Sequence, residues 1–225
     1  MPEIADRLSD IRARIGAALA RSPDPGREVT IVAVTKTRPA EVIDEVAAAG
    51  VLDIGESRVQ EALAKAPLVR TRVRWHLVGH LQRNKARRAV ELFSVIHSVD
   101  SLPLLDLLAA SGRPLQAFLE INVLGDVRKH GARPEHARAL RQAALGTGTI
   151  EVLGLMTVPP LEGDPRPAFR TLRELLGDLN RAGDGPPLRC LSMGMSGDFE
   201  AAVEEGATHV RIGTALVAAR SHGGR

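Results

Sequence analysis

The sequence predicts a single (β/α)8 barrel of the TIM type with an extra N-terminal helix. Short β-branched runs alternate with segments of helical periodicity along the chain, and the strand candidates number eight. Near-continuous apolar strands separated by helices are typical of a parallel sheet covered by helices. A length of 225 residues suits one such barrel and leaves no room for a second large domain. An open, doubly wound sheet is the alternative.

The first 28 residues predict a helix and a loop that cover the barrel. Apolar side chains recur there at steps of three and four, the spacing of one helix face: Ile4, Leu8, Ile11, Ile15 and Leu19. We expect the barrel itself to span residues 29–220, without a linker or a domain boundary inside it.

The eight predicted strands follow in order, with helical segments between them. Val42, Ile43, Val46 and Ala47 show the helical spacing in one of these segments. The predicted strands are residues 29–36, 51–56, 73–79, 93–100, 115–123, 150–158, 188–195 and 209–215.

The composition excludes several classes of protein. Hydrophobic residues make up 44% and charged residues 25%, which is ordinary for a globular protein and unlike a disordered chain. No apolar run is long enough for a membrane span, and the N-terminus lacks the pattern of a secretion signal, so we expect a cytoplasmic protein without membrane contact.

The single cysteine, Cys190, permits no intrachain disulfide. With no Tyr, one Trp and four Phe, the chain lacks the aromatic platforms of single-strand binders, and we expect no nucleic-acid partner.

Polar residues at strand ends are the candidates for chemistry, because the sites of such barrels lie at the carboxyl ends of the strands. Lys36 ends the first strand candidate, and alternation with Val32 and Val34 predicts that it points into the barrel. Desolvation there favours the neutral amine, which can form a Schiff base. A lysine that reaches out of the barrel mouth to solvent is the alternative.

The last two strand candidates carry the features of a phosphate site. Such sites in barrels are often built from the loops after strands seven and eight. Gly213 allows a close approach of the backbone, Thr214 offers a hydroxyl, and Ser196 is a donor where the seventh strand turns into a helix. A helix cap is the alternative role for Ser196.

Five ordered motifs together resemble the YggS/PROSC family of pyridoxal 5′-phosphate (PLP) homeostasis proteins. They are Val34-Thr35-Lys36-Thr37-Arg38-Pro39, Gly55-Glu56-Ser57-Arg58-Val59-Gln60-Glu61, Trp75-His76-Leu77-Val78-Gly79-His80-Leu81-Gln82-Arg83-Asn84-Lys85, Leu191-Ser192-Met193-Gly194-Met195-Ser196 and Arg211-Ile212-Gly213-Thr214-Ala215. The resemblance runs from about residue 29 to residue 220. It implies a barrel like the N-terminal domain of alanine racemase.

The resemblance also implies a cofactor and its ligands. PLP would form a Schiff base on Lys36, and its phosphate would be held by Ser196, Gly213 and Thr214. Arg211 would lie at the pyridine nitrogen and His76 near the ring. The family usually has Gly-Glu-Asn where this chain has Gly55-Glu56-Ser57, which puts a ring-side contact of Ser57 in doubt.

The expected function is that of a PLP carrier, buffer or regulator without turnover, acting as a monomer with apo PLP-dependent enzymes as acceptors. A racemase or decarboxylase is one alternative, although alanine racemase uses a tyrosine from a second domain and this chain has neither. A phosphate-binding metabolic barrel is the other. His76 and His80 lie four residues apart but lack the helical His-Glu-x-x-His arrangement, so we expect no metal site.

Overall fold

Eight parallel strands form a closed barrel in the computed structural model, which describes residues 3–126, 128–160 and 162–217. The strands follow the chain in order, and β1 pairs with both β2 and β8, so the sheet has no edge and the open-sheet alternative is wrong. The strands are β1 (Thr30–Val34), β2 (Asp53–Glu56), β3 (Arg74–Leu77), β4 (Val95–Val99), β5 (Leu115–Glu120), β6 (Ile150–Met156), β7 (Cys190–Met195) and β8 (His209–Ile212).

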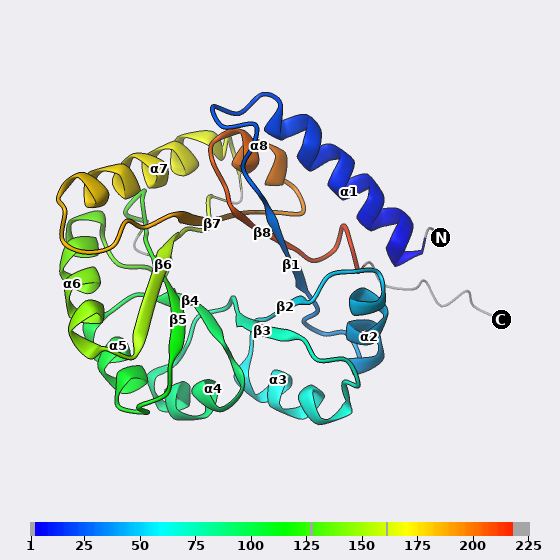
Figure 1. The fold of residues 1–225 in the computed structure, drawn as a ribbon, viewed down its shortest axis with the longest axis horizontal. Helices are drawn as coiled ribbons and strands as arrows, with labels where there is room; N and C mark the ends of the chain where they lie inside the picture. Colours follow the sequence, from blue (N-terminus) through cyan, green and yellow to red (C-terminus); the bar gives the residue numbers. More distant parts are fainter. Residues whose placement is uncertain (1–2, 127, 161, 218–225) are drawn as a thin grey trace.

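The helices form a ring around the strands (Figure 1). They are α1 (Ile4–Leu19), α2 (Ala40–Ala48), α3 (Val59–Lys65), α4 (Ala86–Leu92), α5 (Leu102–Ala109), α6 (Ala137–Thr147), α7 (Arg166–Arg181) and α8 (Phe199–Glu204), with 3-10 turns η1 (Ala66–Leu68), η2 (Arg83–Lys85) and η3 (Pro134–His136). In the described part of the chain, every helix falls short of the length and apolar content that a membrane span requires.

The predicted cover helix is confirmed as α1, which lies beside α8 (Figure 1). Leu8, Ile11 and Ile15 are buried as the spacing predicted. Ion pairs fasten the two helices, because Arg14 Nε lies 2.8 Å from Glu200 Oε1 and Arg21 Nε lies 2.8 Å from Glu204 Oε1. The predicted end of the barrel at residue 220 lies outside the described residues.

All eight predicted strands are confirmed, but most are shorter at their carboxyl ends. β1 ends at Val34 rather than at Lys36, because a turn follows in which the N–H of Arg38 donates to the carbonyl oxygen of Thr35 at 3.0 Å. The hydroxyl of Thr35 donates to Glu56 Oε1 at 2.7 Å. β8 ends at Ile212, and residues 213–217 form turns instead of continuing the strand. The residues expected at strand ends therefore lie on the loops of the barrel mouth.

The interior of the barrel contains few apolar side chains. Most of the buried apolar residues lie between strands and helices, whereas a separate small cluster consists of Val95, Phe118 and Met156. Buried polar residues include His76, His97, Ser192 and Arg211. Since buried polar groups are stable only when hydrogen-bonded, this interior needs a connected network.

Candidate functional site

Lys36 lies on the turn that follows β1 at the mouth of the barrel. Its side chain is exposed, so the prediction of an inward, desolvated lysine is wrong, because the strand ends two residues earlier. The next residue, Thr37, has a φ of 62° and is the non-glycine residue with a positive φ in the described chain. Such strain persists only where the surrounding structure enforces it, and it often marks functional sites.

A buried ion pair beneath this turn holds it in place. Lys65 Nζ donates to Glu56 Oε1 at 2.8 Å, to Glu61 Oε1 at 2.6 Å and to the carbonyl oxygen of Thr35 at 2.9 Å. Glu61 Oε1 also accepts a hydrogen bond from the backbone N–H of Thr37 at 2.5 Å. Burial raises the pKa of Glu56, although the hydrogen bonds from Lys65 and Thr35 act in the opposite direction. Helix α3 thus holds the backbone on both sides of Lys36, at Thr35 and at Thr37.

The loops after β7 and β8 meet at Ser196. Its Oγ accepts hydrogen bonds from the backbone N–H groups of Gly213 and Ala215, both at 3.2 Å. Ser196 is half-buried and Thr214 is exposed. Backbone N–H groups that converge beside a hydroxyl are donors of the kind that bind phosphate, and phosphate binding at this position stays a prediction. The alternative role of Ser196 as a helix cap is not observed, because Asp198 is the N-cap residue of α8.

The same turn depends on a glycine. Gly194 in β7 has a φ of 94°, and a Cβ there would lie 2.5 Å from the Cβ of Ala202. Only glycine satisfies both conditions, so α8 can pack closely against β7 and set the position of the Ser196 loop.

Arg211 is buried in the barrel below the mouth. It donates from Nη1 to Ser192 Oγ at 2.8 Å and from Nη2 to the carbonyl oxygen of Thr157 at 3.0 Å. Burial lowers the pKa of Arg211 to about 10, while the charges of Glu120 and Asp198 raise it. The guanidinium is thus charged at neutral pH, and two of its nitrogens have fixed partners.

His76 is buried inside the barrel, and its place near the PLP ring stays a prediction. It lies within β3, where Nε2 is 2.9 Å from Asp53 Oδ1 and Nδ1 is 2.9 Å from His97 Nε2. Both ring nitrogens are therefore engaged by protein groups. The alternation of β3 turns this side chain inward, where it is fully buried.

A directional chain of hydrogen bonds runs from Asp53 to Arg211. Although burial raises the pKa of Asp53, the hydrogen bond from His76 lowers it, and the net pKa is below its usual value. A carboxylate there accepts from His76 Nε2, so His76 Nδ1 accepts from His97 Nε2. His97 Nδ1 then accepts from Ser192 Oγ at 2.8 Å, which leaves the Ser192 oxygen free to accept from Arg211.

Glu120 ends β5 and was missed by the sequence reasoning. The whole residue is 7% exposed, and its Oε2 has no hydrogen-bond partner in the described chain. Burial, together with the charge of Asp100, raises the pKa of Glu120 to about 7, although Arg211 acts in the opposite direction. The carboxyl group at the end of an apolar strand could have indicated Glu120 as a site residue. In the same way, polar residues within apolar strands could have indicated His97 and Ser192.

Ser57 follows β2 and lines a groove of about 420 Å³ with His80, Gln82 and Lys85. The groove lies where the loops after β2 and β3 come close together. A Cβ on Gly79 would lie 2.4 Å from the carbonyl oxygen of Ser57, so glycine is needed at this approach. Contact between Ser57 and a cofactor stays a prediction.

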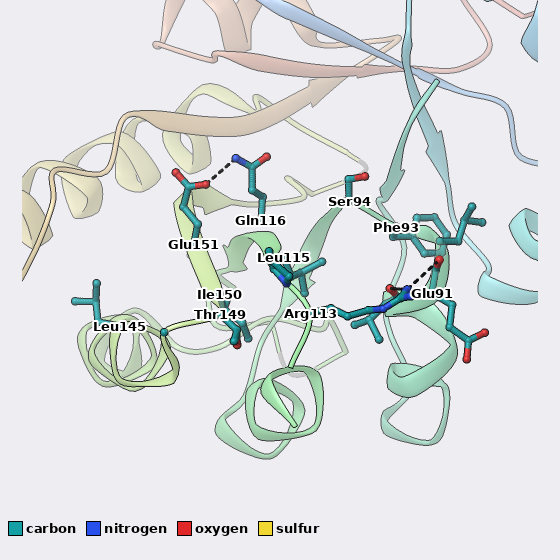
Figure 2. A pocket seen from close by; sticks show the side chains of 14 residues that line it. Glu91, Phe93, Ser94, Arg113, Leu115, Gln116, Leu145, Thr149, Ile150 and Glu151 are labelled. Carbon is teal, nitrogen blue, oxygen red and sulfur yellow. Dashed lines mark hydrogen bonds between the residues drawn. The ribbon is translucent and has the colours of Figure 1, made fainter. Parts of the chain in front are cut away.

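A second groove, of about 790 Å³, lies at the opposite end of the barrel, where β4, β5 and β6 begin (Figure 2). Gln116 Nε2 donates to Glu151 Oε2 at 2.7 Å across it, and Arg113 Nη1 donates to the carbonyl oxygen of Val90 at 3.1 Å. None of the predicted site residues lines this groove. The polar side chains of the mouth therefore define the candidate site.

Comparison with known proteins gives consistent results. Residues 7–221 match the family described as alanine racemase, N-terminal domain. The pyridoxal phosphate homeostasis protein of Pseudomonas aeruginosa is 43% identical, and the match covers 99% of this chain and 98% of that protein. The protein of the same name from Escherichia coli is 34% identical over 99% of each chain.

A solved structure also matches closely. PipY of Synechococcus elongatus, with PLP bound, is 37% identical and superposes with a TM-score of 0.84, covering 95% of this chain and 99% of that one. Alanine racemase of Corynebacterium glutamicum, at 16% identity and a TM-score of 0.67, shares the barrel fold over 94% of this chain and 64% of its own.

Proposed function

Because this chain belongs to the pyridoxal phosphate homeostasis protein family and carries an alanine racemase N-terminal domain, we propose that it binds PLP at the barrel mouth. Lys36 Nζ holds the cofactor as a Schiff base, formed from the lysine amine and the PLP aldehyde with loss of water. The chain acts in the homeostasis of PLP as its carrier, buffer or regulator, as one barrel domain.

The geometry around Ser196 is the single observation that carries this proposal. The N–H groups of Gly213 and Ala215 already converge on one oxygen, and a phosphate oxygen can take the same two donors. Ser196 then donates its own hydroxyl proton to the phosphate, and Thr214 adds a second hydroxyl. Charge-assisted bonds of this kind are the stronger hydrogen bonds of proteins.

Lys36 is the best placed of the four lysines in the sequence to hold the cofactor. Lys65 is engaged by Glu56 and Glu61, and Lys129 Nζ donates to the carbonyl oxygens of Val158 and Pro159 at 3.3 and 2.6 Å. Lys85 lies in the groove beside Ser57, away from the loops after β7 and β8. Lys36 follows the strand that pairs directly with β8, and no interaction is recorded for its ammonium within residues 3–126, 128–160 and 162–217.

Arg211 fits the pyridine nitrogen of PLP. Bound PLP supplies an electron sink, which is strongest when the pyridine nitrogen is protonated. An arginine is a donor only, so at that nitrogen it holds the ring unprotonated. The chain through Ser192, His97 and His76 fixes the Arg211 side chain in place, since each link accepts from the next.

The absence of tyrosine supports a role without turnover. A racemase needs an acid on the face opposite its lysine, and alanine racemase uses a tyrosine that this sequence does not contain. We accordingly assign a non-catalytic role to the protein, as a cytoplasmic monomer that supplies PLP to apo PLP-dependent enzymes. A racemase or decarboxylase is the competing function.

Borohydride trapping tests the proposal. Reduction of the PLP-loaded protein should fix one pyridoxyl group on the peptide that contains Lys36, as read by mass spectrometry. Lys36→Ala should lose this adduct and the visible absorbance of the Schiff base, whereas Lys85→Ala should keep both. The loaded protein should turn over no common amino acid at the enzymic scale of about 1 to 1000 per second. An unchanged adduct in Lys36→Ala, or such turnover, would overturn the proposal.

A further inference from the structure

Three side chains of types that can bind metals gather at the mouth, on the loops after β3, β4 and β5. His80 follows β3, Asp100 follows β4, and His130 lies in the loop after β5. One ligand atom from each lies within 4.8 Å of the other two. His80 Nδ1 is 3.7 Å from Asp100 Oδ2, and the two imidazole rings stack with centroids 3.7 Å apart.

The loops hold these three groups together. Ser101 Oγ donates to Asp100 Oδ1 at 3.0 Å, which leaves Oδ2 directed toward His80. Asn122 Nδ2 donates to the carbonyl oxygen of Asp126 at 2.8 Å, and Ile121 forms a bridge with Ala132, so both ends of the His130 loop are fastened to the barrel. The cluster is thus built by three neighbouring strands.

We propose that His80, Asp100 and His130 form a binding site for a divalent transition metal, with Zn²⁺ as the best match. Two imidazoles and one carboxylate are a common protein ligand set for zinc, and water completes the coordination. Tetrahedral ligands at about 2.0–2.1 Å from zinc lie about 3.3 Å apart, close to the separation between His80 and Asp100. This site goes beyond PLP binding and replaces the sequence prediction that the chain binds no metal.

Binding requires one small rearrangement. The two rings are nearly parallel, with an angle of 9° between their planes, so their nitrogen lone pairs run side by side. One ring must rotate about χ2 for both to reach one ion. Both histidines are exposed, so rotation displaces no packed side chain.

The charges around the cluster favour a cation. Glu120 interacts electrostatically with Asp100, so a second acidic side chain acts on the site. The neighbouring basic groups are occupied elsewhere, because Arg128 pairs with Asp126 at 3.1 Å and Lys129 donates to backbone carbonyls of the loop after β6.

Titration with Co²⁺ and Zn²⁺ tests the site. Full-length protein without a histidine tag should bind one Co²⁺, seen as visible d–d absorbance, and one equivalent of Zn²⁺ should displace it. His130→Ala and Asp100→Asn should each weaken Zn²⁺ binding at least about tenfold, since even losing an outer-shell partner costs that much. His136→Ala removes another exposed histidine, outside the cluster, and should bind as the unsubstituted protein does.

The experiment is run with and without added PLP, so that metal binding is judged independently of the proposed cofactor. Equal binding in both preparations, lost in His130→Ala, supports the site even if Lys36 carries nothing. No bound Co²⁺, or an affinity that neither His130→Ala nor Asp100→Asn changes, would show that the three side chains form only a stacked pair with a neighbouring carboxylate.

Discussion

Ser196 shows how a single residue can join two loops. Ser196 lies in the loop after β7, and its hydroxyl oxygen accepts hydrogen bonds from two backbone N–H groups of the loop after β8. A bound phosphate would receive those donors together with the serine proton. Without a ligand, Ser196 therefore holds the two loops together. With PLP bound, it would contact the phosphate, so substitution of Ser196 tests the proposed phosphate site.

Ser196→Ala should weaken PLP binding by about tenfold to a hundredfold, since one charge-assisted hydrogen bond contributes about 1.5 to 3 kcal/mol. The visible absorbance at saturating PLP should stay unchanged, because the proposed covalent link lies at Lys36. Titration followed by absorbance gives the dissociation constant. Ser94→Ala, an exposed serine at the opposite end of the barrel (Figure 2), is the matched control. Equal affinity of Ser196→Ala and the unsubstituted protein would place the phosphate elsewhere.

Among the secondary-structure elements, α3 has the most direct effect on the candidate site. It is only seven residues long, yet its last residue, Lys65, enters the interior beneath the turn after β1. The ion pair with Glu56 is buried, and the same ammonium holds the carbonyl oxygen of Thr35. The position of α3 therefore determines the position of the backbone next to Lys36.

Lys65→Met should lower the free energy of unfolding by about 3 to 5 kcal/mol, because it leaves Glu56 buried without its partner. Urea denaturation measures this loss. The double variant Lys65→Met, Glu56→Gln should recover part of it, since no uncompensated charge then remains. Lys85→Met removes a lysine without such a partner and should change the stability little. A stability of Lys65→Met equal to that of the Lys85→Met control would show that the ion pair is not structural.

At the scale of the whole molecule, closure of the barrel buries three histidines and so determines their protonation state. The strands β3, β4 and β8 bring His76, His97 and His209 together, and Phe118 lies against His97 and His209. Burial lowers the pKa of all three, and that of His209 falls from 6.5 to about 4, with the charge of His76 as the second cause. The folded protein thus keeps these imidazoles neutral.

Stability should therefore fall on acidification. A histidine whose folded pKa lies below its unfolded value stabilises fully above about pH 6.5 and loses that contribution as the pH falls toward 4. For His209 the loss by pH 4.5 is about 2 to 3 kcal/mol, at about 1.4 kcal/mol per tenfold change in proton affinity. Glu120, with its raised pKa, acts in the opposite direction over pH 4.5 to 7, so a comparison of variants is needed to isolate the contribution of His209.

Denaturation of His209→Gln at pH 7.5 and 4.5 isolates this contribution. The variant should lose about 2 to 3 kcal/mol less stability between the two pH values than the unsubstituted protein does. His136→Gln, an exposed histidine on η3, should behave like the unsubstituted protein. Identical pH dependence of His209→Gln and the unsubstituted protein would mean that His209 is not held neutral by the fold.

The sequence by itself determined the barrel, its eight strands, the cover helix and the PLP family. Those features depend on local periodicity and on ordered motifs, which a linear chain displays directly. The residues of the proposed phosphate site could also be predicted from the sequence, because Ser196, Gly213 and Thr214 follow the strands after which barrels commonly bind a phosphate.

Only the tertiary structure decided where the side chains point and what they contact. Counting by two along β1 turned Lys36 inward, but the strand ends at Val34, and the strained turn at Thr37 leaves the lysine exposed. The sequence did not reveal the partners of His76, because Asp53 and His97 lie on neighbouring strands that reach it only in the closed barrel. His80, Asp100 and His130 converge from the loops after three separate strands, and such long-range proximity arises only when the sheet closes into a barrel.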